Sequence, residues 1–234
     1  MALRPVFVAT DSCPFVIEQP VDFKYYSGFA LSQQQKSIQS LHEAFHKLPN
    51  CDKINTLEVS SKSTERIGNL LSAFNLVYRL KNGDYCPLEC VFQAGKVFED
   101  MTQFVDIMEK TPREAKHDTR LREHGGIIQF KLGDDVFSTE PKTYFYDWIY
   151  CNALHQNTGL TNELLRYGAF TDIAFNPQKS LNCQARSAAK YVGLTQAGLL
   201  ETALRSKEDF LRIAYKNVET VVEQVQLRMG LLDQ

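Results

Sequence analysis

Residues 88–98 carry the most informative pattern of apolar and polar positions in the chain. The stretch is apolar except at Glu89, Gln93 and Lys96 and the glycine between the last two. In a helix, with about 100° per residue, these three polar residues fall within an arc of about 60°. A helix that is apolar on both flanks is normally buried. The pattern therefore predicts a helix over 88–100 with one narrow polar stripe.

Two interpretations of this stripe stay open from periodicity alone. If it is buried, a carboxylate, an amide and an amine share a site where charges are costly unless paired and where pKa values shift. Such a site can supply an acid or base and a nucleophilic amine. In the other interpretation the stripe faces solvent, and only the two flanks pack on neighbouring elements.

Hydrophobic periodicity elsewhere predicts many helices and a few short strands. Segment 1–30 is expected to be extended and to lie on the main body. Helices are predicted over 32–47 (with Ser32 at its start), 102–110, 112–117, 142–155, 161–167 (with Thr161 as N-cap), 183–192, 196–204 and 206–229. Strands are predicted over 57–59 and 173–175, and hairpins over 76–87 and 127–137. The expected fold class is α+β, mainly helical with small antiparallel β-hairpins.

Composition removes several classes of function. A net charge of -2 means that any contact with nucleic acid has to be a local patch. No apolar run approaches the roughly 20 residues of a membrane span, and a secretory leader is lacking, so we expect a cytoplasmic protein with no membrane contact. The six cysteines have no CxxC spacing and the five histidines no HExxH pattern, so neither a metal site nor a cofactor is expected.

Polar candidates lie in three further places. Arg113 opens a basic stretch over 113–124, and Ser61 and Lys62 lie in a loop after a predicted strand. Either group can neutralise phosphates, or simply form solvated surface. Asp172 lies near the end of a predicted strand, where both catalytic carboxylates and turn residues occur. Asn182 is predicted to cap the helix over 183–192, or to face a ligand phosphate or sugar.

Several blocks in the same order resemble the NADAR family. Residues 89–96 are similar to its Glu-x-x-Phe-Gln-x-x-Lys signature, 71–74 to its Leu-Ser-Asn-Phe element, and Asn182 to the Asn of its late Gly-x-Asn element. The resemblance covers about 55–205. Within the family, the blocks at 28–33, 72–76, 146–148, 152–157 and 182–187 look most like NADAR proteins paired with DarT-type toxins. Ala73 departs from the pattern, and the family's Asp-x-x-Trp-Gly element is absent.

The resemblance implies an ADP-ribosylglycohydrolase that removes ADP-ribose from guanine bases in DNA and so reverses a DarT-type toxin. It implies an N-terminal extension over 1–54, a NADAR-like catalytic domain over 55–205 and a C-terminal helix over 206–234. The expected partners are ADP-ribosylated DNA and a cognate toxin. Whether the chain serves a host toxin–antitoxin pair or a phage that counters one stays open.

In the expected mechanism, Lys96 captures the sugar as a Schiff base and Glu89 shuttles protons. Spacing on one helix would separate these two by about 10.5 Å, so they would flank the ligand, with Gln93 on a ribose hydroxyl. The other expected substrate-binding residues are Phe92, Ser72, Phe74, Ser61, Lys62, Asn182, Asp172 and Arg113. Two alternatives stay open: an N-glycosidase acting on a free nucleotide-like metabolite, and a binding-only antitoxin.

Overall fold

The computed structural model describes residues 1–178 and 180–215. The strands are β1 (Ala2–Ala9), β2 (Val16–Phe23), β3 (Thr56–Glu58), β4 (Val77–Arg79), β5 (Tyr85–Pro87), β6 (Lys96–Phe98), β7 (Ile127–Leu132), β8 (Asp135–Ser138) and β9 (Ala169–Thr171). The α-helices are α1 (Leu31–His46), α2 (Arg66–Leu70), α3 (Leu88–Ala94), α4 (Pro112–Lys116), α5 (Tyr144–His155), α6 (Thr158–Leu164), α7 (Gln184–Gln196), α8 (Leu200–Ala203) and α9 (Lys207–Tyr215). Two 3₁₀ turns, η1 (Val105–Glu109) and η2 (Thr119–Arg122), complete the chain. The predicted α+β class is confirmed.

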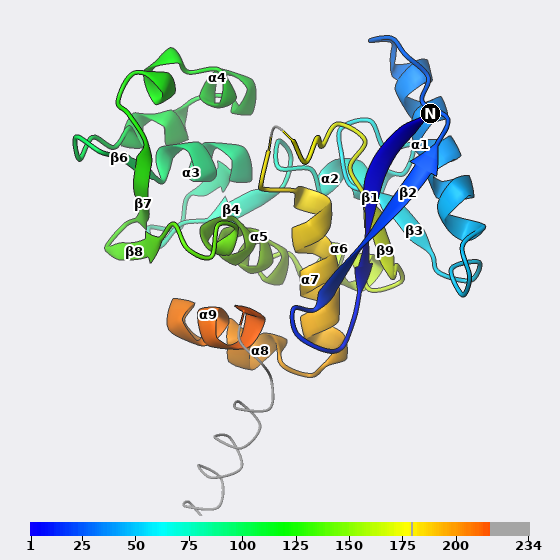
Figure 1. Cartoon of the computed structure of the whole chain (residues 1–234). Helices are drawn as coiled ribbons and strands as arrows, with labels where there is room; N and C mark the ends of the chain where they lie inside the picture. The colour runs from blue at the N-terminus through cyan, green and yellow to red at the C-terminus, as the bar shows by residue number, and fades with distance from the viewer. Residues whose placement is uncertain (179, 216–234) are drawn as a thin grey trace, which may run out of the picture.

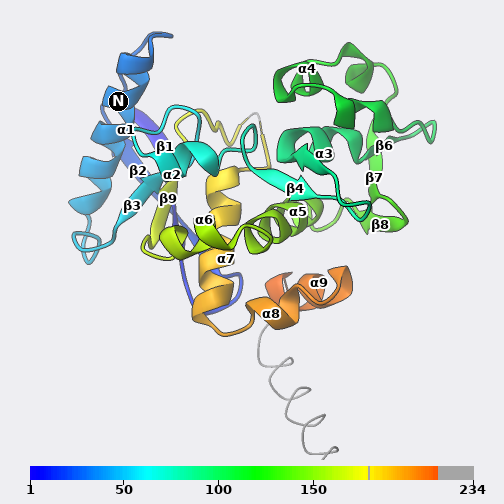
Figure 2. The ribbon, with the colours of Figure 1, turned by 180° about the vertical axis from the view of Figure 1, so that it is seen from behind.

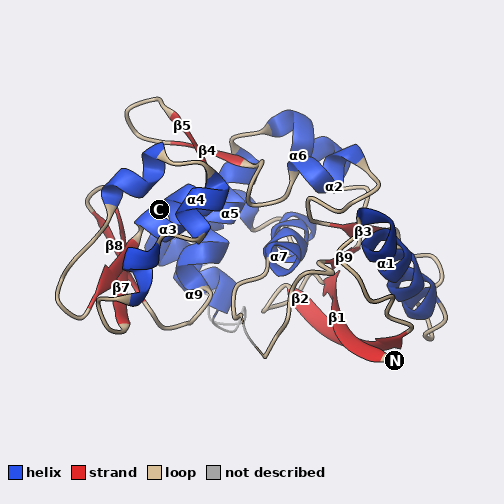
Figure 3. Cartoon of the chain, turned by 90° about the horizontal axis from the view of Figure 1, so that it is seen from above, coloured by secondary structure: helices blue, strands red, loops and turns tan. Residues whose placement is uncertain are grey.

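A four-stranded sheet in the order β2-β1-β9-β3 forms one half of the molecule. Viewed from above, β3 and β9 lie between α1 on one side and α7 on the other (Figure 3). Alternate side chains of β1 serve the two faces: Val6 joins the core under α1, and Phe7 joins the core that includes α7. Segment 1–30 is extended, as predicted, but β1 is a strand inside the sheet and does not lie over the body.

The other half of the molecule is built around α5. This helix packs against α3, α7 and β4, and the strands β6, β7 and β8 form a small antiparallel sheet beside it (Figure 2). Aromatic rings join these elements: Phe130 stacks on Phe145 with 4.7 Å between ring centroids, and Phe92 stacks on Phe130 at 5.8 Å. Such pairs add stability beyond the area that they bury. These ring contacts, which also include β7, hold α3 against α5.

Gly193 lies inside α7, so the predicted break between two helices at this glycine is wrong. The helix runs on to Gln196, and at Gly193 it passes very close to the loop between β1 and β2. A Cβ at position 193 would lie 2.2 Å from the carbonyl oxygen of Phe15 and 2.4 Å from that of Thr10. The glycine thus serves close packing of helix and backbone rather than helix termination.

Several predicted boundaries need correction. Both hairpins are confirmed, but the strand expected at 173–175 lies at Ala169–Thr171, where it pairs with β1 and β3. Helix α6 begins at Thr158 after Asn157, and Thr161 instead donates a hydrogen bond to the carbonyl of Thr158 within the helix. Ser32 lies in the first turn of α1 and forms no cap.

The last predicted helix begins at Lys207, and its predicted part beyond Tyr215 lies outside the described residues. In both Figure 1 and Figure 2, α8 and α9 lie beneath α5. Over residues 1–178 and 180–215, none of the helices has the length and apolar character needed to cross a bilayer.

Candidate functional site

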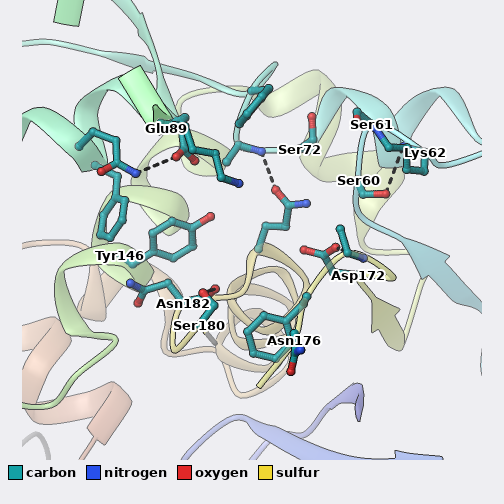
Figure 4. Close-up of a pocket in the computed structure, with 18 residues that line it drawn as sticks. Ser60, Ser61, Lys62, Ser72, Glu89, Tyr146, Asp172, Asn176, Ser180 and Asn182 are labelled. Carbon is teal, nitrogen blue, oxygen red and sulfur yellow. Dashed lines mark hydrogen bonds between the residues drawn. The ribbon is translucent and has the colours of Figure 1, made fainter. Parts of the chain in front are cut away.

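A cavity of about 480 Å³ lies where the two halves of the molecule meet. Its walls come from α3, from the loops after β3, α2 and β9, from the end of α4, and from the starts of α5 and α7 (Figure 4). The lining residues are Ser60, Ser61, Lys62, Ser72, Ala73, Phe74, Glu89, Phe92, Gln93, Lys116, Tyr146, Asp172, Ala174, Phe175, Asn176, Ser180, Asn182 and Gln184. Most of the residues expected to bind substrate are therefore in one place; Lys96 and Arg113 are not in the lining.

The polar stripe of 88–98 is buried and forms a hydrogen-bonded chain. Glu89 and Gln93 are each 7% exposed. The Gln93 amide nitrogen donates to Glu89 Oε1 at 2.8 Å, and the Lys96 amine donates to Gln93 Oε1 at 2.6 Å. The stripe is therefore not a solvated face: one amide joins the carboxylate that lines the cavity to the amine behind it.

Lys96 lies on a strand, so the prediction of a helix running to residue 100 is wrong. Helix α3 ends at Ala94, and Gly95 follows because a Cβ there would lie 2.6 Å from the ring of Phe145. The Gly95 carbonyl then accepts a hydrogen bond from the Lys131 N–H, and β6 starts its pairing with β7. The helical separation expected between the amine and Glu89 is replaced by a link through Gln93.

Besides its hydrogen bond to Gln93, the Lys96 amine has an aromatic ring as a neighbour. It lies 5.1 Å from the centroid of the Phe92 ring, within the range of a cation–π contact. Burial lowers the pKa of Lys96, and the charge of Glu89 partly opposes this effect. The amine is thus easier to deprotonate than an exposed lysine, as a nucleophile requires, and it is one hydrogen bond away from the cavity.

The opposite side of the cavity holds a second carboxyl group, that of Asp172. Beneath it lies Glu58, which is buried and accepts hydrogen bonds from the Ser60 and Thr171 hydroxyls and from the Ile173 N–H, at 2.6, 2.6 and 2.9 Å. Burial, together with the charge of Glu58, raises the pKa of Asp172 to about 7. Near neutral pH this carboxyl group can therefore hold a proton.

The Asp172→Asn variant is expected to change the pH dependence of stability. The folded protein favours the neutral carboxyl, so the contribution of this group is full below pH 3.8 and is lost as the pH rises through about 7. Between pH 5 and pH 8 the variant should therefore gain on the order of 2 kcal/mol relative to the wild type. Urea denaturation at the two pH values measures this. Asp134→Asn, in an exposed turn, is the control; equal pH slopes for wild type and Asp172→Asn would contradict the assignment.

Cationic and hydroxyl groups gather around Ser60–Lys62 and the end of α4. The Lys62 amine donates to the Ser61 hydroxyl at 2.8 Å, and the Lys62 N–H donates to the Ser60 hydroxyl at 3.1 Å. Lys116 lies with its amine 5.4 Å from the centroid of the Phe74 ring. Arg113, in the first turn of the same helix, is exposed and does not line the cavity. Lys116, and not Arg113, is the cation that this helix contributes to the lining.

Other lining residues were missed by sequence reasoning, or were expected to have another role. Gln184 braces two loops, because its amide accepts from the Ala73 N–H at 2.7 Å and donates to the Val59 carbonyl at 2.6 Å. Asn182 is not the helix cap, since Cys183 holds that position. Asn182 instead lines the cavity. Tyr146 lies in an apolar run typical of a core, so no signal in the pattern separates it from its neighbours.

The residues that the structure describes contain no group of three or more His, Cys, Asp or Glu side chains placed to hold a metal ion. All six cysteines are free thiols.

Comparison with known proteins gives one family. The family model for the DarT1-associated NADAR antitoxin matches residues 2–224. No curated protein matches the chain.

Proposed function

Because this chain belongs to the DarT1-associated NADAR antitoxins, its role is that of an antitoxin associated with DarT, and we propose that it acts by hydrolysing the bond between ADP-ribose and guanine bases in DNA. The observation that carries the proposal is the buried chain of Lys96, Gln93 and Glu89 along one wall of the cavity. The cavity volume of about 480 Å³ lies within the range of small-molecule sites.

The proposed reaction uses an amine with a lowered pKa. Opening of the ribose ring leaves a C=N bond between the anomeric carbon and the guanine nitrogen. Lys96, released from Gln93, gives a proton to Glu89, and its free amine adds to this carbon. The guanine amine then leaves with the proton from Glu89 and a second proton from the lysine nitrogen. The product is a Schiff base between Lys96 and the sugar. Water, deprotonated by Glu89, then releases ADP-ribose and restores the lysine, so one water is consumed for each bond cleaved.

On the basis of charge, we assign the diphosphate to the other side of the cavity. Phosphate oxygens accept hydrogen bonds and favour cations. Lys62 and Ser61, which are hydrogen-bonded to each other, supply a cation and a hydroxyl there, and Lys116 adds a second cation to the cavity lining. The carboxylate of Glu89 is an unfavourable neighbour for phosphate, so we assign the wall that carries Glu89 to the sugar and the base.

The test is release of ADP-ribose from an oligonucleotide that carries one ADP-ribosylated guanine. We expect multiple turnovers with the oligonucleotide and at least about ten-fold slower turnover of the free modified nucleoside, since only DNA offers contacts outside the cavity. Equal turnover of both substrates would favour the metabolite hydrolase instead. A Glu89→Ala, Lys96→Ala double variant that still protects cells from the toxin would favour the binding-only antitoxin.

A further inference from the structure

The geometry points to a subsite, formed by the Tyr146 hydroxyl and the Asn182 amide, that binds the ribose–guanine junction of the substrate and not its phosphates. This inference rests on the proposed function for the identity of the substrate. The two side chains come from α5 and from the loop before α7, and neither role follows from the hydrophobic pattern.

The ring of Tyr146 is fixed in place. The residue is 6% exposed, its ring meets Phe92 edge-on with 5.1 Å between centroids, and it stacks on Tyr150 at 6.2 Å. Figure 4 shows its hydroxyl directed into the cavity. Because the ring cannot turn away, the hydroxyl is presented to whatever occupies the cavity.

The two other tyrosines of α5, and Tyr215 of α9, use their hydroxyls within the protein. Tyr144 donates to the Lys207 carbonyl, Tyr150 to the Leu71 carbonyl and Tyr215 to Asp147, at 2.5, 2.8 and 2.6 Å. Over residues 1–178 and 180–215, the Tyr146 hydroxyl has no such partner. Because it faces the cavity, this hydroxyl can form its hydrogen bond with a ligand bound there.

Asn182 decides which part of the substrate lies here. Its side-chain oxygen is buried, and the described residues give it no hydrogen-bond donor. A phosphate diester oxygen carries no proton at neutral pH and cannot satisfy an acceptor, whereas ribose hydroxyls and guanine N–H groups can. Tyr146 is suited to the same groups, because burial and the nearby charges of Glu89 and Asp172 raise its pKa and keep the phenol neutral.

The two sides of the cavity therefore differ in what they can bind. In Figure 4, Glu89, Tyr146 and Asn182 lie on one side, and Ser61 and Lys62 lie on the other. A substrate with its sugar–base junction on the first side and its diphosphate on the second matches both sets of groups. In this orientation the anomeric carbon lies against the α3 side of the cavity, where Gln93 lines the cavity and holds the Lys96 amine by a hydrogen bond.

Tyr146→Phe tests the subsite, because it removes the hydroxyl and keeps the ring packing. ADP-ribose and ADP are the probes, since they differ by the ribose that carries the anomeric carbon. Isothermal titration should show affinity for ADP-ribose falling about ten-fold, as expected for one lost hydrogen bond, with affinity for ADP unchanged. Turnover of the modified oligonucleotide should fall by at least the same factor.

Tyr150→Phe is the matched control. It removes a hydroxyl that donates to the Leu71 carbonyl, so it should lower stability while leaving the ratio of ADP-ribose to ADP affinity unchanged. Unchanged ADP-ribose affinity in Tyr146→Phe, an equal loss for both probes, or no binding of either probe by the wild type would overturn the subsite. A wild type that releases no ADP-ribose from DNA but shows the predicted discrimination would overturn the proposed function alone.

Discussion

Lys96→Ala is expected to lower the turnover of ADP-ribosylated DNA by about 10³-fold or more, equivalent to about 4 kcal/mol of transition-state stabilisation. The reason is that no neighbouring group replaces the amine. Glu89 and Gln93 carry no nucleophilic nitrogen. Of the two lysines in the cavity lining, Lys62 lies on the far side of the cavity, and the Lys116 amine lies against the ring of Phe74. Borohydride added during turnover should reduce the Schiff base and leave the wild type heavier by the sugar adduct. The variant should show no adduct in intact-mass spectra.

Two controls separate chemistry from charge and folding. Lys96→Arg keeps a cation beside Gln93 but cannot form a Schiff base, so it should be as inactive as the alanine variant. Lys131→Ala removes a lysine from the small sheet that contains β6, at a position outside the cavity lining, and should trap adduct like the wild type. Full turnover by Lys96→Ala, or an adduct that persists in it, would refute the covalent route.

The role of the amide between the two charged groups follows from the same geometry. Gln93 accepts from the amine and donates to the carboxylate, so it holds the Lys96 amine in place by a hydrogen bond. The substrate has to compete for that hydrogen bond before the amine can add.

Local patterns were enough to predict the polar stripe and both hairpins. Each depends on residues close in sequence: the spacing of Glu89, Gln93 and Lys96, and the turn residues at 82–83 and 133–134. The end of α3 was beyond reach for the same reason. Position 95 has to be glycine because of the Phe145 ring, which lies 50 residues away in sequence, and β6 forms after it by pairing with β7. Both partners are met only in the folded chain.

The rest of the site depends on contacts between residues that lie far apart in the sequence, so local patterns could not predict it. Asp172 follows a strand that lies between β1 and β3, and its raised pKa depends on Glu58, more than 100 residues earlier. Tyr146 lies in an apolar helix, where a core position and a cavity wall have the same sequence pattern. Only the tertiary arrangement shows which tyrosine hydroxyls are satisfied and which one faces the cavity.

Asp147→Ala is expected to destabilise the fold by about 3–5 kcal/mol, the range found when one partner of a buried ion pair is removed. Lys190 is 0% exposed and donates to Asp147 Oδ2 at 2.6 Å. The same carboxylate accepts from Ser187 and Tyr215, and Arg186 lies 3.5 Å from it. One side chain thus joins α5, α7 and α9, and its loss leaves the Lys190 ammonium buried without a counter-ion.

A double variant, Asp147→Leu with Lys190→Met, distinguishes loss of the pair from loss of general packing. If the uncompensated ammonium causes the damage, removing both charges should recover most of the lost stability, because a buried pair replaced by apolar residues of similar volume is often nearly neutral. Chemical denaturation with a constant m-value measures each step. A double variant as unstable as Asp147→Ala would show that the ion pair is not the main contribution. The hydrogen bonds that the wild-type Asp147 carboxylate accepts from Ser187 and Tyr215 would then be what holds α9 against α5 and α7.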